Sequence, residues 1–430
     1  AQLCAGAIYL FAVLGIRNAS HGKAMFLWII LVGFVLRAAL LFSAPIIEDD
    51  YYRYLWDGAV VAGGMNPYSH APGRALDADE DPGSVPADLY ELAERSGLVA
   101  SRINHPDLRT IYPPVAQGAF ALAHWLRPWS MLAWRLVLLL FDVAALVILI
   151  FILQTLRLPL LWVAIYWWNP VLIKETFNSG HMDVVAVPFL LMAVLLAVRG
   201  NRLVGIVSLA LAAGAKVWPV VLAPLFLRPL SAKPKRLVVA LCLLGILSVA
   251  MFVPIYAGGL DNESGFTAYG KRWEMNDSLY MLFFWGCKFL MKAAGLHIGN
   301  AQLVARVVVL LLLALWIGWL ARDKAADGVD LCEKCLYVVA AVFLLSPTQF
   351  PWYFIWVLPF LAISPRPSLL LLTALLPLYY LRFYFDARDN VAVFDYGIVW
   401  LEFAPVWFLL IWEWHKGRRQ RASLPSEATA

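Results

Sequence analysis

Charged residues are scarce in this sequence, at 15% of its 430 residues, whereas about 25% is usual in soluble domains. The chain has only five cysteines, and three of them lie inside apolar runs, which excludes a disulfide-rich secreted scaffold. Segments of about ten residues with alternating apolar and polar side chains, typical of a transmembrane β-barrel, are absent. With 62% hydrophobic residues and 19 tryptophans, the chain is expected to be an all-α polytopic membrane protein.

Apolar runs long enough to cross a hydrocarbon core of about 30 Å recur along the whole chain. The run that ends at Ile16 has no cleavage-site pattern, so we expect a first helix there rather than a signal peptide. We expect a single integral membrane domain (1–430) with about 12–13 transmembrane helices. The expected spans are 1–16, 24–43, 111–126, 131–155, 159–173, 183–198, 203–227, 237–256, 301–320, 335–345, 351–363, 367–383 and 393–415.

Two connections rich in basic residues indicate the cytoplasmic side of the membrane. "RPLSAKPKR" (228–236) and "HKGRRQR" (415–421) each hold four Lys or Arg and no acid. Counting spans from them places residues 47–110 on the exoplasmic side, in a loop with twelve acids, five Arg and no Lys, a net charge of −7. The count closes only if 257–300 also stays outside as an interfacial segment. We therefore expect a cytoplasmic C-terminus, with a disordered tail at 422–430.

The loop 47–110 is too long for a simple connection, since loops of this length are usually functional or disordered. Helical periods in "DLYELAER" and "SGLVASRI" favour an ordered loop with short surface helices, of which only "ALDADEDPGSVP" is expected to be flexible. Three consecutive acids, Glu48, Asp49 and Asp50, open the loop. Adjacent like charges repel and raise at least one pKa, which suggests a use, although acids that only cap a surface helix would leave the same pattern.

The sequence around the three acids is more specific than the acids themselves. They are followed by "YYRYLWDGAVVAGGMNPY", and the loop returns to the membrane through "INHPDLRTIYPPVAQ", whose prolines suit a first helical turn. In this order, the stretches resemble the first exoplasmic loop of GT-C glycosyltransferases that use a polyprenyl-phosphate sugar, and most closely the polyprenol-phosphate-mannose-dependent mannosyltransferases. Further similar stretches are "NPVLIKETFNSGHMD", "GAKVWPVVLAP", "YGKRWEMNDSLY" and "SPTQFPWYFIWVLP", so the resemblance extends from about Pro45 to Leu358.

The resemblance implies a GT-C fold and a lipid-linked donor that is used at the exoplasmic face, where a loop carboxylate acts as the base. Asp50 stands at the matching position immediately before Tyr51, and Glu48 takes the other acidic position of the pattern. Because Glu48 replaces the commoner Asp and Asp49 is an additional acid, the choice of base among the three stays open. The implied substrates are a polyprenyl-phosphate sugar, most simply mannose, and a lipid-linked or polysaccharide acceptor of the cell envelope. Membrane lipids are expected partners, nucleic acid is not, and we assume a bacterial inner membrane.

The chemistry of such a transfer explains why carboxylates and cations are needed. An acceptor hydroxyl must lose its proton as it attacks the anomeric carbon, so a positioned carboxylate is the natural general base. The phosphate leaving group needs positive charge rather than an acid. One base without a second carboxylate nucleophile predicts inversion at the anomeric carbon. No cofactor is expected, although clustered carboxylates beside a phosphate would also suit a divalent cation. Candidates for binding the donor phosphate are Arg53, Arg109, Lys271, Arg272 and Lys216.

Other side chains are expected to surround the sugar and the acceptor. These candidates are Tyr51, Asp57, His105, Tyr112, His181, Asn276, Trp352 and Tyr353. His105 and His181 are also weaker candidates for the donor phosphate. Asn276 belongs to "KRWEMND", which could instead be an interfacial anchor, and Trp352 with Tyr353 could form part of an aromatic belt.

Two polar features inside expected spans have alternative explanations. Lys216 lies in the middle of a span, where a charge is costly and usually functional, but its ammonium could also snorkel toward the cytoplasm. The break "KETFNSGHMD" (174–183) could be a short polar turn, and the span count places it on the cytoplasmic side. If the flanking segments are half-helices, the same break would line the cavity from within.

A secondary transporter or flippase is the alternative function from another class. Transporters usually show repeat symmetry and broken helices in both halves, and neither is evident here. An envelope polysaccharide ligase or polymerase would share the many helices and the large loop, but not the pair "DDYYRYLWDG" and "TIYPP". "CEKC" at 332–335 lacks the second Cys/His pair of a zinc site, so two incidental loop thiols are the simpler interpretation.

Overall fold

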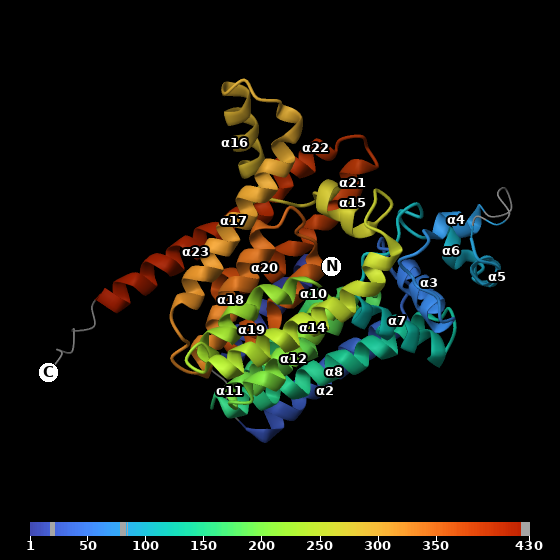
Figure 1. Ribbon diagram of the computed structural model, residues 1–430. Coiled ribbons are helices and arrows are strands. Elements are labelled where there is room, and N and C mark those ends of the chain that lie inside the picture. The colour runs from blue at the N-terminus through green and yellow to red at the C-terminus, as the bar shows by residue number, and fades with distance from the viewer. Residues whose placement is uncertain (18–21, 78–82, 84, 423–430) are drawn as a thin grey trace.

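A computed structural model describes residues 1–17, 22–77, 83 and 85–422, and the regular secondary structure of this part is helical throughout, with one isolated bridge between Met275 and Thr348. The helices form a bundle with four short helices, α3 to α6, gathered at one end (Figure 1). The disordered tail expected at 422–430 lies outside the described residues from position 423 onward, as do residues 78–82 and 84 of the expected flexible stretch. The α-helices are α1 (Gln2–Arg17), α2 (Lys23–Leu41), α3 (Tyr51–Ala62), α4 (Pro72–Leu76), α5 (Ala87–Arg95), α6 (Leu98–Ser101), α7 (Pro114–Leu126), α8 (Met131–Thr155), α9 (Val163–Trp167), α10 (Pro170–Ile173), α11 (Val187–Val198), α12 (Arg202–Ala215), α13 (Ala223–Leu227), α14 (Pro234–Gly258), α15 (Gly265–Arg272), α16 (Leu279–Ala293), α17 (Ala301–Arg322), α18 (Gly328–Leu345), α19 (Leu358–Ile363), α20 (Pro367–Leu375), α21 (Leu381–Asp386), α22 (Val391–Val393) and α23 (Val399–Ala422).

Short 3-10 and π-helical segments connect or extend these helices. They are η1 (Leu160–Trp162), η2 (Lys174–Asn178), η3 (Met182–Ala186), η4 (Trp218–Leu222), η5 (Arg228–Leu230), η6 (Ile298–Asn300), η7 (Pro351–Trp356), η8 (Leu376–Tyr380) and η9 (Phe394–Ile398).

Six helices in the described part of the chain are long and apolar enough to cross a membrane. They are Lys23–Leu41, Met131–Thr155, Pro234–Gly258, Ile298–Arg322, Pro367–Asp386 and Val391–Lys416. A seventh is added if Pro170–Asn178 and Met182–Val198, which are bent by 108° at a short break, count as one span. The all-helical, polytopic class is thus confirmed.

Fewer helices meet the length of a span than the 12–13 expected, because many apolar runs are interrupted. The run 159–173 is divided into η1, α9 and α10, and the run 203–227 breaks at Lys216 between α12 and η4. Prolines and polar residues at these breaks remove or divert helical hydrogen bonds. Such irregular backbone is tolerated at membrane depth where it is buried in protein or lines a cavity.

Helix α14 extends from the basic segment 228–236 to the acidic loop 47–110, which it contacts. Its 25 residues span about 37 Å at 1.5 Å per residue. At its far end, Asn66 Nδ2 of the loop donates a hydrogen bond to the Pro254 carbonyl at 3.0 Å. The basic connection and the acidic loop therefore lie at opposite ends of a membrane-spanning helix.

A buried ion pair fixes α2 against α8 in the middle of the bundle. Arg37 Nε lies 2.6 Å from Asp142 Oδ2, and both side chains are fully buried. Tyr166 donates its hydroxyl proton to the other carboxylate oxygen of Asp142 at 2.8 Å, and Arg37 also donates to the Trp167 carbonyl. Because each buried charge has several partners, the network ties three elements together rather than leaving a charge unpaired.

Helix α3, which begins directly after the three acids, lies on α7 at very short range. A Cβ atom on Gly58 would lie 2.4 Å from the Phe120 carbonyl oxygen, so only glycine permits this approach. The rings of Tyr54 and Phe120 stack with their centroids 4.9 Å apart. This contact holds the start of α3 in a fixed position relative to the bundle.

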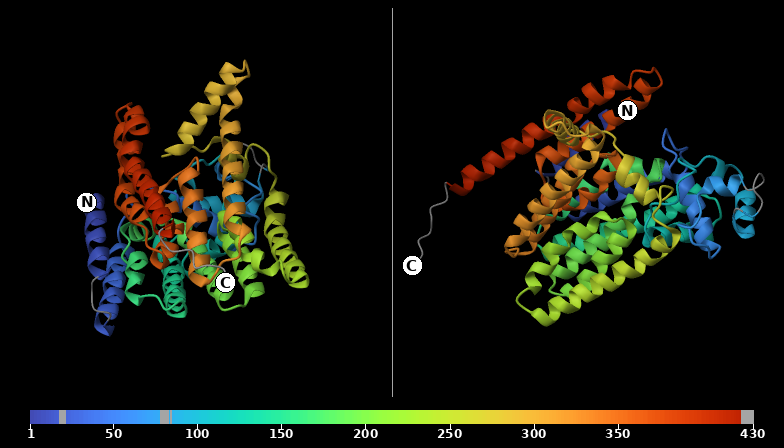
Figure 2. Two further views of the ribbon diagram at one scale, coloured as in Figure 1. Left: turned by 90° about the vertical axis from the view of Figure 1, so that its left-hand side faces the viewer. Right: turned by 45° about the horizontal axis from the view of Figure 1, so that its top comes forward.

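The second segment expected outside the membrane, 257–300, contains α15 and α16. Figures 1 and 2 show α16 beside α17, with both helices projecting from the bundle. Tyr280 of α16 donates to the Gln302 carbonyl at 3.2 Å, and residues near Met275 pair with 347–349. Cys332 and Cys335 are buried on α18, so the expectation that they lie in a loop is wrong.

Candidate active site

The break between η2 and η3 lies against the residues that lead into the three acids. Asn178 Nδ2 donates to Ser43 Oγ and to the Ala44 carbonyl, both at 2.8 Å, and the Ile46 amide donates to Asn178 Oδ1 at 3.2 Å. Arg135 on α8 donates to the carbonyls of Ser43 and Asn178, each at 2.7 Å. The placement of 174–183 on the side opposite the acidic loop is therefore wrong, because the break packs against the residues that lead into the acids.

The chain turns sharply at this break because several local features act together. Residues Lys174–Asn178 form a π-helix, a widened turn that is often found at functional sites. Gly180 then adopts a φ of +79°, which disfavours any side chain. Trp134 Nε1 donates to the Gly180 carbonyl at 2.7 Å. The following residue, His181, is thereby turned toward the acids.

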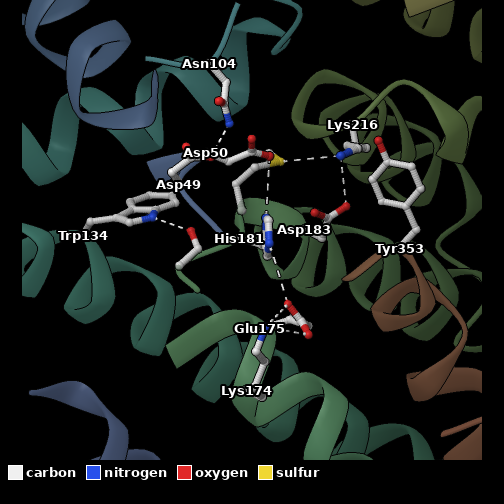
Figure 3. A network of polar contacts seen from close by, with 12 residues as sticks. Asp49, Asp50, Asn104, Trp134, Lys174, Glu175, His181, Asp183, Lys216 and Tyr353 are labelled. Atoms are coloured by element: carbon white, nitrogen blue, oxygen red, sulfur yellow. Dashed lines mark hydrogen bonds and ion pairs between the residues drawn. The ribbon is translucent and has the colours of Figure 1, made fainter. Parts of the chain in front are cut away.

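His181 lies between two carboxylates (Figure 3). Its Nδ1 atom is 3.8 Å from Asp50 Oδ2, and its Nε2 atom is 3.6 Å from Glu175 Oε2. The imidazole is completely buried, and among the described residues neither ring nitrogen has a hydrogen-bond partner. Both distances exceed a normal hydrogen bond, so a small closure of the site is needed to complete either one.

A second charged pair lies beside this line of residues. The extended backbone at Lys216 ends α12, and the Lys216 ammonium lies 3.0 Å from Asp183 Oδ1. Trp356 Nε1 donates to the same carboxylate oxygen at 2.8 Å. The ammonium is also 4.5 Å from the ring centroid of Tyr353, a cation–π distance. Lys216 thus points into the site and does not snorkel away from it.

On the far side of His181, Glu175 belongs to a third group of polar side chains. Tyr380 donates its hydroxyl proton to Glu175 Oε1 at 2.7 Å, and the Lys174 ammonium lies 3.3 Å from Glu175. Lys174 also contacts the Tyr380 hydroxyl. Lys174 and Glu175 therefore do form the expected ion pair, but the pair lies in the site and not in an isolated surface turn.

Glu48 and Asp50, at the start of the loop, differ in pKa and therefore in protonation state at neutral pH. Burial, followed by the neighbouring charge of Asp49, raises the pKa of Asp50 to about 6. Burial and then the charge of Glu175 raise the pKa of Glu48 to about 8. At neutral pH, Asp50 is therefore mostly ionised and Glu48 mostly protonated. Asp49 is held by the side-chain amide of Asn104.

One protein-family model matches the chain. The family model described as "Glycosyltransferase family 87" matches residues 110–347, which is more than half of the chain. The chain belongs to glycosyltransferase family 87. No curated protein and no solved structure matches it. A transferase family of this kind gives no support to the alternative of a transporter or flippase.

The part matched to family 87 contains the bent helix pair, His181 and Lys216, but not the three acids. The polar residues around His181 are thus joined by a segment from before the matched range and, through Trp352 and Tyr353, by one from after it. The contacts of Asn178 with Ser43 and Ala44 join the first of these segments to the matched part.

Two arginines expected at the donor phosphate also hold the loop of this family 87 chain together. Arg53 is buried, and its guanidinium donates to the carbonyls of Asn104, His105 and Leu108. Arg109 pairs with Asp261 at 2.5 Å, which joins the two outer segments. These contacts use the Nη2 atom of each arginine, so both side chains position the loop, and their contact with the donor phosphate stays a prediction.

Several other expected site residues also lie away from His181 or have structural partners. Asp57 accepts a hydrogen bond from Gln117 Nε2 at 3.0 Å, and Asn276 donates to Glu402 Oε1 at 2.9 Å. His105 meets Trp273 edge to face, and Tyr51 packs against Tyr52. The remaining positions are Tyr112, which packs edge to face on Tyr54, and Lys271 with Arg272, which are exposed on α15.

Trp352 is in the site but is not free to stack on a sugar. Its ring lies parallel to His181 at 3.8 Å and to Phe350 at 4.5 Å between centroids. Two rings so close cannot share one face of the indole, so both of its faces are covered. Trp352 instead holds the plane of the His181 imidazole.

Three contributors to the site were not singled out from the sequence: Asn104, Tyr380 and Trp356. Each acts through a contact that joins distant parts of the chain, and a single sequence carries no signal for such contacts. Within the described ranges, no group of three or more His, Cys, Asp or Glu side chains is placed to share a metal ion. The expectation that no cofactor is required remains a prediction.

Proposed function

We propose that the chain is an inverting glycosyltransferase that moves one sugar, mannose by the resemblance of its motifs, from a polyprenyl-phosphate donor to a lipid-linked or glycan acceptor. The reaction takes place at the exoplasmic face of a bacterial inner membrane, with the C-terminus in the cytoplasm. Membership of a glycosyltransferase family, apolar helices suited to a membrane and the line of polar residues around His181 support this proposal.

The observation that carries the proposal is the environment of Asp50. Its side chain is 30% exposed, so an acceptor hydroxyl can reach it, and its pKa of about 6 leaves it ionised but still basic at neutral pH. A general base works best when its pKa lies near the working pH. Glu48, with a pKa of about 8, is mostly protonated at that pH and is a poorer base. Asp50 therefore takes the proton of the acceptor hydroxyl.

His181 acts on the reaction through Asp50. It lies behind the carboxylate, 3.8 Å away, and its other nitrogen faces Glu175. A hydrogen bond donated by the imidazole Nδ1 would orient Asp50, and a neutral imidazole then has no second N–H proton to donate to Glu175. We therefore describe His181 as a positioning residue, and we expect it to affect turnover more than donor binding.

Positive charge for the departing phosphate comes from the lysines that face the site. Lys216 and Lys174 each point into it, and each retains a hydrogen-bond donor beyond those used in its present contacts. Their charge stabilises the phosphate as it takes up negative charge in the transition state. Attack by the activated hydroxyl on the face opposite the phosphate inverts the anomeric carbon, so a β-linked donor gives an α-linked product.

The direct test is sugar transfer by purified protein in nanodiscs, with radiolabelled polyprenyl-phosphate mannose and a membrane lipid extract as acceptor. Asp50→Asn is expected to lower transfer by at least about 100-fold, the usual contribution of a general base. Asp49→Asn, which changes the neighbouring acid in the same way, is the matched control and should retain most of the activity.

Other outcomes of this test would change the assignment of the base or of the donor. Full activity of Asp50→Asn together with an inactive Asp49→Asn or Glu48→Gln would transfer the role of base to that residue. Absence of transfer from every polyprenyl-phosphate sugar offered to the wild type would overturn the proposed donor.

A further inference from the structure

Glu402, on α23, is a fully buried carboxylate whose charge has no counterpart in the described part of the chain. Its Oε1 atom accepts a hydrogen bond from Asn276 Nδ2 at 2.9 Å, whereas its Oε2 atom has no hydrogen-bond partner among the described residues. No Lys, Arg or His side chain of that part forms an ion pair with it. Because a buried carboxylate is costly without compensation, its charge must be balanced by a proton or by a bound ion.

Two amide oxygens beside Glu402 are in the same situation. Asn276 Oδ1 and Gln349 Oε1 are buried and accept no hydrogen bond from the described residues. Asn276 Nδ2 donates to the Gln349 carbonyl at 3.1 Å as well as to Glu402, and Gln349 Nε2 donates to the carbonyls of Leu344 and Ser346, each at 3.1 Å. Exchange of N and O in either amide would set oxygen against oxygen, so both orientations are fixed.

These three residues meet at the Asn276 amide, whose Nδ2 atom contacts both Glu402 and Gln349. The two outer atoms of an amide or a carboxylate are about 2.2 Å apart, so Glu402 Oε2 and Asn276 Oδ1 are separated by at most about 7 Å. Oxygen ligands of calcium, an ion of nearly the size of sodium, lie about 2.4 Å from it, so two of them are at most about 5 Å apart. A modest rotation of the side chains therefore brings both oxygens onto one ion.

We propose that Glu402, Asn276 and Gln349 bind a monovalent cation of the size of sodium or potassium. Oxygen atoms are the ligands that such hard cations prefer. One carboxylate and two neutral amides match a single positive charge, whereas a divalent ion would leave a net charge buried among apolar side chains. A proton on Glu402 would serve only one of the three oxygens.

The end of α18 adds a second favourable feature for a cation. Gln349 lies over this end, because its side chain donates to the Leu344 and Ser346 carbonyls. The C-terminus of a helix carries a partial negative charge, which stabilises a nearby cation. Sodium sites in other membrane proteins use helix C-terminal ends and irregular backbone in this way. Asn276 itself has a φ of +56°, and backbone outside the usual regions is concentrated at functional sites.

A cation at this place would hold the outer segment 257–300 against the bundle. Met275 already pairs with the backbone of 347–349, through its amide to the Pro347 carbonyl and through its carbonyl to the Gln349 amide, both at 2.9 Å. Gln349 leads into η7, whose Trp352 ring packs on His181. The ion would thus support one wall of the candidate active site without entering the reaction, and the proposal does not depend on the transferase function.

The first test measures binding of the ions themselves. Protein in nanodiscs and choline chloride buffer is titrated with radioactive sodium, and separately with radioactive rubidium as a tracer for potassium. We expect one saturable site for at least one of the two ions, which empty nanodiscs lack. Unlabelled magnesium and calcium at the same concentration should not displace the tracer.

Two substitutions on α23 form a matched pair for this measurement. Glu402→Gln removes the charged ligand and should weaken binding by at least about tenfold. Glu413→Gln changes a carboxylate that accepts hydrogen bonds from Ser368, farther along the same helix, and should bind the tracer as the wild type does. Absence of saturable binding to the wild type, or equal binding by Glu402→Gln, would overturn the proposal.

Thermal unfolding provides a second measurement that needs no tracer. The unfolding temperature of the wild type should rise with sodium or potassium chloride relative to choline chloride of equal ionic strength, because the ion binds only the folded protein. Glu413→Gln should respond in the same way. Glu402→Gln should not respond, and in choline chloride it should be at least as stable as the wild type, because no buried charge remains.

An unfolding temperature of the wild type that is the same in all three salts would contradict the proposal. An equal response of Glu402→Gln and the wild type would do so as well, since it would place the effect elsewhere in the molecule. Neither measurement uses sugar transfer, so failure of this proposal leaves the proposed function intact, and failure of that function leaves the cation site intact.

Discussion

Glu48 and Asp50 are two residues apart, yet at neutral pH they are expected to differ in charge. Burial raises the pKa of both, to about 8 for Glu48 and about 6 for Asp50. The difference follows from their neighbours, since Glu48 faces Glu175 as well as the other acids of the loop. A site with three acids can therefore offer one base without placing three full negative charges beside an anionic donor.

This difference predicts a bell-shaped pH dependence of kcat/KM. Asp50 must be ionised to act as a base, so activity is lost as the pH falls through about 6. Ionised Glu48 would repel the donor phosphate, so activity is also lost as the pH rises through about 8. Initial rates between pH 4.5 and 9.5 measure both limbs.

Glu48→Gln isolates the alkaline limb of this profile. The variant cannot ionise, so its activity should persist above pH 8 while the acid limb stays near pH 6. An unchanged alkaline limb in Glu48→Gln would show that another group controls it.

At the scale of elements, the bent pair made by α10 with η2 and by η3 with α11 positions the site. Its 108° bend turns the chain within a few residues, and His181 lies at the bend between Asp50 and Glu175 (Figure 3). Asn169 begins this unit, because its side chain accepts hydrogen bonds from the Val171 and Leu172 amides. The geometry of the bend therefore decides where the imidazole lies.

Replacement of the glycine at the bend should affect activity more than stability. Gly180→Ala forces a side chain into a φ of +79° and against the Met131 side chain. Gly200→Ala is a matched control, because Gly200 has a similar φ of +85° in a turn with open space around it. Each change should cost about 1 kcal/mol of stability. Only Gly180→Ala should also lower kcat/KM, by about 100-fold if His181 moves by about 1 Å.

Thermal unfolding and transfer rates of the two variants, measured in the same nanodiscs, separate these effects. Equal losses of activity in Gly180→Ala and Gly200→Ala would show that the bend does not position the reacting groups.

The buried pair between α2 and α8 makes a prediction about stability alone. Arg37→Met leaves Asp142 as a buried charge without its main partner and should lower the free energy of unfolding by about 3–5 kcal/mol. Arg37→Met with Asp142→Leu removes both charges and should recover much of that loss. Unfolding temperatures of the single and double variants give the comparison, and a double variant less stable than the single one would contradict this interpretation.

For the whole molecule, the sequence predicted the class of fold better than the course of the chain. The helical, polytopic architecture is confirmed, and "YYRYLWDG" and "DLYELAER" do form the helices α3 and α5. Only α5 lies at the surface, since residues 53–60 of α3 are buried. The break at 174–183 was placed on the wrong side, because counting apolar runs as full spans cannot reveal that a helix stops halfway and turns back. A sequence shows the charges of Arg53 and Arg109 but not the distant carbonyls to which their guanidinium groups donate.

The two ends of α14 provide a test of the proposed orientation. In a cysteine-free background, Ser101→Cys lies in the acidic loop and Ser231→Cys lies in the basic connection, and both positions are exposed. An impermeant maleimide added to intact spheroplasts should label Ser101→Cys at once and Ser231→Cys only after permeabilisation. The reverse pattern would place the active site in the cytoplasm.

Helices α1 and α2 carry exposed apolar side chains, such as Ile8 at 69% and Leu36 at 40% exposure, as is expected of helices that face lipid. The polyprenyl-phosphate donor proposed above is itself a membrane lipid, so the enzyme would sample it by two-dimensional diffusion. Its effective concentration is then the mole fraction in the membrane rather than the amount per volume of solution. Added inert lipid should slow transfer by surface dilution, whereas added buffer should not.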